Sequence, residues 1–293
     1  MMAMIALEPG VRRIVARNPS PMTRDGTCTY VVGTGVVGVI DPGPADPLHI
    51  QALLAGLAPG ERVGAIFVTH AHLDHSPGAR LLAQATGAMV HAFGAVDAGR
   101  SAIMTRLMAQ GMMGGGEGAD AAFQPDVTLA DNARVSGDDW TLQALHTPGH
   151  FGHHLSFALG DAVFTGDAVM GWSSTLISPP DGDLGDYLRS LTRLAEYGAR
   201  RFYPGHGEPV DTPHARLTEL TAHRHARSHQ IMAILHKRPA TVSFIVDAIY
   251  HDLSADLHAS AARNVFAHLI EMYSRNEICA EPFPTPDAVF FCK

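Results

Sequence analysis

Residues 67–78, which read FVTHAHLDHSPG, place three histidines and one aspartate within six consecutive positions. These metal-binding residue types are His70, His72, Asp74 and His75. The apolar run VGAIFVTH predicts a buried strand and SPGARLLAQAT predicts a helix, so the four residues lie on a strand-to-helix turn. On such a turn the side chains of His70 and His72 can point the same way, while those of Asp74 and His75 face a neighbouring point. One metal ion cannot comfortably bind all four side chains, so the motif predicts that they form one side of a site for two metal ions.

Three further strand ends finish on a residue that can bind a metal ion. The runs WTLQALHTPGH, LSFALGDAVFTGD and ARRFYPGHG each predict a strand that stops at a glycine-containing turn, and these turns carry His150, Asp167 and His206. A single turn of this kind is ordinary, because glycine and proline occur in loops everywhere. A carboxylate can bridge two cations, so Asp167 suits a shared position. Five imidazoles and two carboxylates favour two zinc ions per chain, with iron or manganese as alternatives.

The pattern of the chain changes near residue 211. The first 210 residues alternate β-branched runs, helical stretches and Gly/Pro turns, as in an α/β fold. Ser76 and Thr212 are each expected to cap a helix that starts at the following proline. From Thr212 onward we expect three helices, the second opened by Thr241, and then a hairpin of the strands ICAE and AVFFC. This is the element order of a winged-helix domain, so we predict a catalytic domain at 1–211 and a winged-helix domain at 212–293.

Composition excludes several classes of protein. The net charge of −8 argues against a general binder of polyanions, because nucleic-acid affinity depends on basic groups that neutralise phosphates. No segment reaches the ~20 apolar residues needed to cross a bilayer, and the N-terminus has no export-signal pattern. Three cysteines without CxxC spacing fit a reducing compartment. We therefore expect a cytoplasmic protein without membrane contact. Pairing into a homodimer through the C-terminal domain is possible, although no residue pattern requires it.

The motif HAHLDH followed by TPGH, GD and PGHG resembles the metallo-β-lactamase superfamily. The resemblance implies a four-layer αββα sandwich, in which His70, His72 and His150 would hold one metal ion. Asp74, His75 and His206 would hold the second, with Asp167 bridging the two. Two cations acidify a shared water, so a bridging hydroxide could attack the substrate, with Asp74 orienting it and passing its proton on. Asp41 and His153 resemble residues that support the ligands from outside.

The C-terminal sequence is similar to the winged-helix extension of the lactamase-β-like-2 branch, which includes a single-strand endoribonuclease and fungal acyl-carrier-protein thioesterases. The resemblance favours a dinuclear zinc hydrolase of a thioester, ester or lactone, as a small molecule or on an acyl carrier. An alternative is an endoribonuclease that cuts single-stranded RNA. A smaller alternative is a mononuclear iron dioxygenase of the persulfide type, which would carry one iron per chain.

Candidate substrate contacts lie in two segments. Trp172, Ser173 and Ser174 follow the proposed bridging aspartate closely, so they lie just beyond the metals. Arg224 and Arg227 belong to a locally basic helix and could receive an anionic group, either a phosphate of CoA or of a carrier arm, or one of RNA. The third predicted helix balances its arginines with acids, so DNA binding is not expected. The Met- and Gly-rich segment 106–123 predicts either a flap over the substrate or a flexible surface loop.

Overall fold

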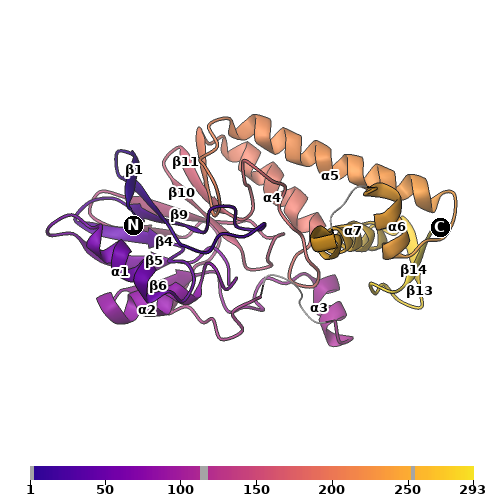
Figure 1. Ribbon diagram of the computed structural model, residues 1–293, viewed down its shortest axis with the longest axis horizontal. Helices are drawn as coiled ribbons and strands as arrows, with labels where there is room; N and C mark the ends of the chain where they lie inside the picture. Colours follow the sequence, from indigo (N-terminus) through magenta and orange to yellow (C-terminus); the bar gives the residue numbers. More distant parts are fainter. Residues whose placement is uncertain (1–2, 113–117, 252–254) are drawn as a thin grey trace.

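Two β-sheets form the centre of the larger part of the molecule (Figure 1). The structure, a computed structural model, describes residues 3–112, 118–251 and 255–293. The first sheet has seven strands in chain order: β1 (Ile5–Glu8), β2 (Val11–Val15), β3 (Cys28–Val32), β4 (Val36–Ile40), β5 (Arg62–Phe67), β6 (Met89–Ala92) and β7 (Val127–Thr128). The second has five, in the spatial order β12 (Arg201–Pro204), β11 (Ala162–Gly166), β10 (Leu155–Leu159), β9 (Thr141–His146) and β8 (Arg134–Ser136).

The two sheets pack face to face through a largely aromatic core. Tyr30 of β3 lies against Phe164 of β11, with ring centroids 5.1 Å apart, and Phe67 of β5 lies 5.2 Å from Phe157 of β10. The buried Tyr30 hydroxyl donates a hydrogen bond to the Pro204 carbonyl at 2.7 Å, so its polar end is satisfied inside the core. This interior holds the C-terminal ends of β5, β11 and β12 in fixed relative positions.

Helices cover both outer faces, which confirms the predicted four-layer αββα arrangement. Buried side chains of α1 (Pro47–Ala55) and α2 (Pro77–Thr86) pack on the first sheet. Those of α4 (Leu184–Tyr197) and of the first turns of α5 (Pro213–Leu235) pack on the second. Within the described residues, none of the helices combines the length and apolar character that a bilayer crossing requires.

Ser76 and Thr212 occupy the predicted N-cap positions before Pro77 and Pro213. Neither side chain accepts a hydrogen bond from its helix. The Ser76 hydroxyl lies instead 3.2 Å from the His72 carbonyl, and thus fixes the turn that carries the histidines. At Ser76 a hydrogen bond within the turn therefore replaces the side-chain cap.

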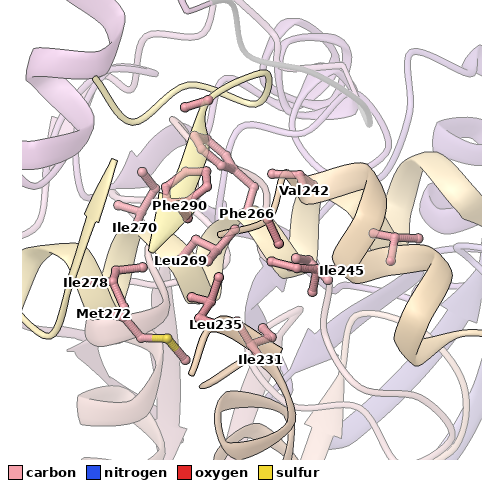
Figure 2. Close-up of a cluster of buried hydrophobic side chains, with 14 of the residues drawn as sticks. Ile231, Leu235, Val242, Ile245, Phe266, Leu269, Ile270, Met272, Ile278 and Phe290 are labelled. Atoms are coloured by element: carbon pink, nitrogen blue, oxygen red, sulfur yellow. The ribbon is translucent and has the colours of Figure 1, made fainter. Parts of the chain in front are cut away.

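The C-terminal part has the predicted order of three helices and a hairpin. After α5 come α6 (Val242–Ile249), α7 (Ala255–Ser274), β13 (Ile278–Glu281) and β14 (Val289–Cys292). Thr241 caps α6 as expected, since its hydroxyl accepts from the Phe244 amide. Figure 2 shows the apolar core of this part, where Leu235, Ile245, Leu269 and Phe290 meet from α5, α6, α7 and β14.

A helix from the middle of the chain completes this C-terminal core. Met104 and Leu107 of α3 (Ala102–Ala109) are each 1% exposed and pack into the same cluster. Farther along, the Leu73 amide donates to the Gly118 carbonyl at 3.0 Å, so the segment returns to the histidine-bearing turn. Part of the predicted flap at 106–123 is therefore a packed helix, and its residues 113–117 lie outside the described residues. The segment links the C-terminal domain to the histidine turn.

Replacing Leu107 by alanine is expected to lower the free energy of unfolding by about 2–5 kcal/mol, because a fully buried leucine would leave a cavity. The measurement is urea unfolding followed by circular dichroism. Leu48→Ala is the matched control, since Leu48 is 66% exposed on α1 and should shift the midpoint little. Equal effects of the two substitutions would contradict the packing of α3 into the C-terminal core.

Candidate metal centre

The turn after β5 and the turn after β9 bring three imidazoles together. His72 Nδ1 lies 2.9 Å from His70 Nε2 and 3.0 Å from His150 Nε2. All three side chains are buried, and one ligand atom from each lies within 4.8 Å of the other two. Three nitrogens that converge at this spacing can share one cation.

A second group forms beside the first. Asp74, His75 and His206 also offer ligand atoms within 4.8 Å of one another. Asp167, at the end of β11, lies between the groups: its Oδ2 is 3.3 Å from His206 Nε2 and 3.7 Å from His150 Nε2. All seven residues singled out from the sequence thus converge at one edge of the two sheets.

Hydrogen bonds to the outer ring nitrogen decide which nitrogen faces the centre in His75, His150 and His206. In three histidines the Nδ1 atom lies against an oxygen that can only accept. These partners are the Asp41 carboxylate for His75 (2.9 Å), the Leu176 carbonyl for His150 (2.8 Å) and the Gly26 carbonyl for His206 (3.2 Å). Each Nδ1–H therefore donates outward, and the Nε2 lone pair is directed inward, as a metal ligand requires.

Asp41 orients two of the histidines. Its Oδ2 accepts from His75 and also from the Thr69 hydroxyl at 2.7 Å, while its Oδ1 accepts from the Thr69 amide. Because the Thr69 hydroxyl proton is used in this way, its oxygen accepts from His70 Nδ1–H at 2.9 Å. The carboxylate of one residue thus holds His75 directly and His70 through a threonine, and its own φ of 48° is unusual for a residue other than glycine.

The second group attracts positive charge. Burial opposes protonation of His206, but the neighbouring Asp167 carboxylate outweighs it and raises the His206 pKa to about 10. Burial also opposes protonation of His75, yet Asp74 and Asp167 raise its pKa well above the usual value. In the first group, burial and neighbouring histidines lower the pKa of His70. Cations, or protons in their place, are therefore stabilised most strongly between Asp74 and Asp167.

These residues fit a metal centre. Imidazole lone pairs are directed inward, and the Oδ1 atom of Asp167 is buried without a hydrogen-bond donor among the described residues. A buried carboxylate oxygen without a donor is costly, and a cation relieves that cost. The mixture of nitrogen and oxygen donors suits zinc, and also iron or manganese.

Three residues that the sequence analysis missed support this centre. Thr27 donates its hydroxyl proton to Asp74 Oδ2 at 2.9 Å, and Thr69 links Asp41 to His70. At Gly205, an added Cβ would lie 2.3 Å from Asp167 Oδ1 and 2.7 Å from His75 Cε1, so a glycine is needed before His206. The PGHG turn was a signal for this glycine, whereas nothing local in the sequence marks either threonine.

A cavity of about 380 Å³ opens onto the centre. It is lined by Asp74 and Asp167, and by Trp172, Ser173 and Ser174, which the sequence analysis placed just beyond the metals. The loop carrying these three residues is held by the C-terminal domain, because Arg216 of α5 donates to the Met170 carbonyl at 2.7 Å and to the Ser173 carbonyl at 2.6 Å. Apolar side chains such as Met170 and Leu176 form much of the remaining wall.

The other predicted site residues lie apart from this cavity. Both nitrogens of His153 are occupied by backbone groups, since Nε2 accepts from the Ala71 amide and Nδ1–H donates to the Ala95 carbonyl, each at 2.8 Å. It therefore supports the histidine turn without offering a free nitrogen. Arg224 and Arg227, both of α5, do not line the cavity at the metal centre. The Arg224 side chain is buried and donates to Asn264 of α7.

Two family descriptions match the chain. Residues 22–206 match the metallo-beta-lactamase superfamily, and residues 241–278 match the beta-lactamase associated winged helix domain. A protein from Drosophila melanogaster named beta-lactamase-like protein 2 homolog is 28% identical over 287 residues, which cover 94% of this chain and 92% of that protein. An atrochrysone carboxyl ACP thioesterase from Aspergillus fumigatus is 29% identical over 270 residues, covering 86% and 76% respectively.

Solved structures show the same fold. A beta-lactamase domain protein from Burkholderia ambifaria aligns with a TM-score of 0.81 over 99% of this chain and 93% of that chain, at 21% identity. TTHA1623 in a di-iron-bound form aligns with a TM-score of 0.50 over 68% of this chain and 96% of that chain, at 28% identity. The similarity covers nearly the whole of this chain in the first case and about two thirds of it in the second.

Proposed function

The chain belongs to the metallo-beta-lactamase superfamily, and from this premise we propose that it is a two-metal hydrolase of acyl thioesters. The observation that carries the proposal is the position of Asp167 between two groups of ligand atoms. His70, His72 and His150 would hold one ion, Asp74, His75 and His206 the other, and Asp167 both. The di-iron-bound relative supports a count of two. When bound, the ions acidify a water molecule and polarise the substrate carbonyl.

Asp74 is the residue that moves the proton in this proposal. It lines the cavity, and its side chain is 23% exposed, whereas those of His75 and His206 are 0% and 2% exposed. Burial favours its neutral form, but His75 and His206 outweigh this and lower its pKa, so it is ionised at neutral pH. A carboxylate in this state can accept a proton from the attacking water and deliver it to the leaving sulfur.

The substrate class follows from the cavity and the relatives. A thioester is hydrolysed when water forms a C–O bond to the acyl carbon and the C–S bond breaks; the sulfur takes up a proton and leaves as a thiol. The walls contributed by Met22, Met170 and Leu176 suit an acyl chain better than a charged polymer. The relative named as an acyl-carrier-protein thioesterase supports the same class. Esters and lactones undergo the same attack and belong in the test.

The test combines metal analysis with a substrate panel. We expect about two metal ions per chain in protein purified without added metal, and hydrolysis of acyl-phosphopantetheine that a chelator abolishes. Labelled single-stranded RNA, an aryl ester and a lactone complete the panel. One iron per chain and no hydrolysis would overturn the proposal in favour of an oxygenase. RNA cleavage without thioester turnover would replace the thioester by single-stranded RNA as the substrate.

A further inference from the structure

A second cavity, of about 180 Å³, lies between α5, α6 and α7, next to the one at the metal centre. Ser174 lines both cavities, so the loop after β11 separates them. Basic and hydrogen-bonding side chains dominate the second one: Arg224, Arg227, Ser260, Asn264 and His268. None of its lining residues within the described chain is an aspartate or glutamate.

Arg224 carries a buried positive charge that no carboxylate pairs with in the described part of the chain. Its side chain is 2% exposed, and its guanidinium donates to two neutral oxygens, the Asn264 side chain at 3.2 Å and the Thr175 carbonyl. It also lies 5.2 Å from the centre of the Tyr187 ring. The Nε–H group is buried without an acceptor in the described part of the chain. Burying a charge without pairing it is expensive. An anion bound in this cavity would therefore pair with the Arg224 charge and accept from its guanidinium.

Arg227 and His268 point to the same conclusion. The Arg227 guanidinium lies 4.2 Å from the centre of the Tyr250 ring, and its Nε is buried without an acceptor among the residues described. His268 is 1% exposed, and its Nδ1 lies 2.9 Å from the Ser228 hydroxyl. Its Nε2 has no hydrogen-bond partner among the described residues. Three side chains from two helices thus line one small cavity and have buried polar atoms without a partner among the described residues.

Burial and the positive charge of the two arginines lower the pKa values of two neighbouring histidines. Burial, followed by the charges of Arg224 and Arg227, lowers the pKa of His268 well below its usual value. The same causes in the same order lower the pKa of His223, which also lines the cavity. The arginines therefore repel further positive charge. A phosphate group has strong acceptor oxygens and negative charge, and the planar guanidinium matches its geometry.

We propose that this second cavity binds the phosphate of a phosphopantetheine arm whose acyl thioester lies at the metal centre. The inference rests on the proposed thioesterase function, because it assigns the other end of the same substrate. A single small cavity suits one phosphate, whereas single-stranded RNA needs a continuous basic groove. Arg275, the first residue after α7, is already paired with Glu271 at 3.0 Å and with Glu277 at 3.1 Å.

The experiment compares acyl-pantetheine with acyl-phosphopantetheine, which differ only by the phosphate. The intact protein is expected to prefer the phosphorylated substrate at least about tenfold in kcat/KM, mainly through KM. Arg227→Gln and Ser260→Glu should bring the ratio of the two kcat/KM values close to one, the first by removing a cation and the second by placing a carboxylate in the cavity. Arg263→Gln is the matched control: this α7 arginine does not line the cavity, so the ratio should persist.

The outcomes separate the inference from the function on which it rests. Hydrolysis of both substrates with equal kcat/KM would overturn the phosphate site and leave the thioesterase intact. Hydrolysis of neither would overturn the thioesterase, and calorimetry with phosphopantetheine and pantetheine would then decide the site. Binding of the phosphorylated molecule alone, lost in Arg227→Gln, supports it; equal binding of the two, or none, rejects it. RNA cleavage that depends on Arg227 without any phosphate preference among thioesters would reassign the cavity to RNA.

Discussion

Asp74→Ala is expected to lower kcat/KM for thioester hydrolysis about 1000-fold or more, because it removes a metal ligand and the proposed proton carrier together. The side chain lines the cavity, and Asp74 Oδ2 lies 3.2 Å from His75 Nε2 and 3.3 Å from His206 Nε2. Metal content should fall from about two ions per chain toward one, since the second group loses its exposed carboxylate. Steady-state kinetics and elemental analysis of the same preparation measure both effects.

One further variant separates the two roles of Asp74, as metal ligand and as proton carrier, and a second serves as the control. His206→Ala weakens the second ligand group but leaves the carboxylate in place, so it should cost less activity than Asp74→Ala at equal metal content. Asp161→Ala is the control, because this exposed carboxylate lies at the β10–β11 turn and pairs only with Arg200 in the described structure. Wild-type activity and two bound ions in Asp74→Ala would show that Asp74 is neither a ligand nor a proton carrier.

The clustering of the seven His and Asp side chains could be predicted because each of these residues follows a strand in a short recognisable motif. His70 and His72 are two positions apart, and the buried run before them identifies a strand. Strand ends that point to one edge of a sandwich bring their side chains together, so the structure unites residues as distant as His70 and His150. The order of the C-terminal elements was likewise readable from the spacing of apolar residues and from the Thr241 cap.

The supporting contacts could not be read in this way, because tertiary packing determines them. Thr27 is 47 residues from Asp74, and no local pattern relates the two. The Met-rich segment 106–123, which predicted a flap or a loop, begins inside α3 (Ala102–Ala109), whose Met104 and Leu107 are buried by α5, α6 and α7. Arg224 was predicted to meet an anion from its place on a basic helix, but its burial and its lack of a carboxylate partner among the described residues appear only in the folded chain. Sequence periodicity reports which face of an element is apolar, and not which distant element covers it.

Removing the metal ions with a chelator is expected to abolish hydrolysis and to lower the melting temperature. A ligand that binds only the folded state stabilises it by about 2.7 kcal/mol at a free concentration 100 times its Kd. For a domain of this size that corresponds to a decrease of roughly 5–11 °C on removal. Differential scanning fluorimetry before and after chelation measures the decrease, and added zinc should restore both temperature and activity. Asp167→Asn is the matched variant, and chelation should change its melting temperature much less.

The size of this decrease should depend on pH in a direction set by His206. Without metal, the Asp167 carboxylate raises the His206 pKa from 6.5 to about 10 despite burial. Protonated His206 therefore stabilises the metal-free protein fully below about pH 6.5, and this contribution is lost as the pH rises toward 10. The raised pKa of His75 acts in the same sense, whereas Asp74 and Asp167, whose pKa values are lowered, stay ionised throughout this window. In the proposed metal-loaded protein His206 would be a neutral ligand without this dependence, so the difference in melting temperature should widen from pH 6.5 to pH 9. A difference that narrowed over this range would mean that protons and metal ions do not compete for the site between Asp74 and Asp167.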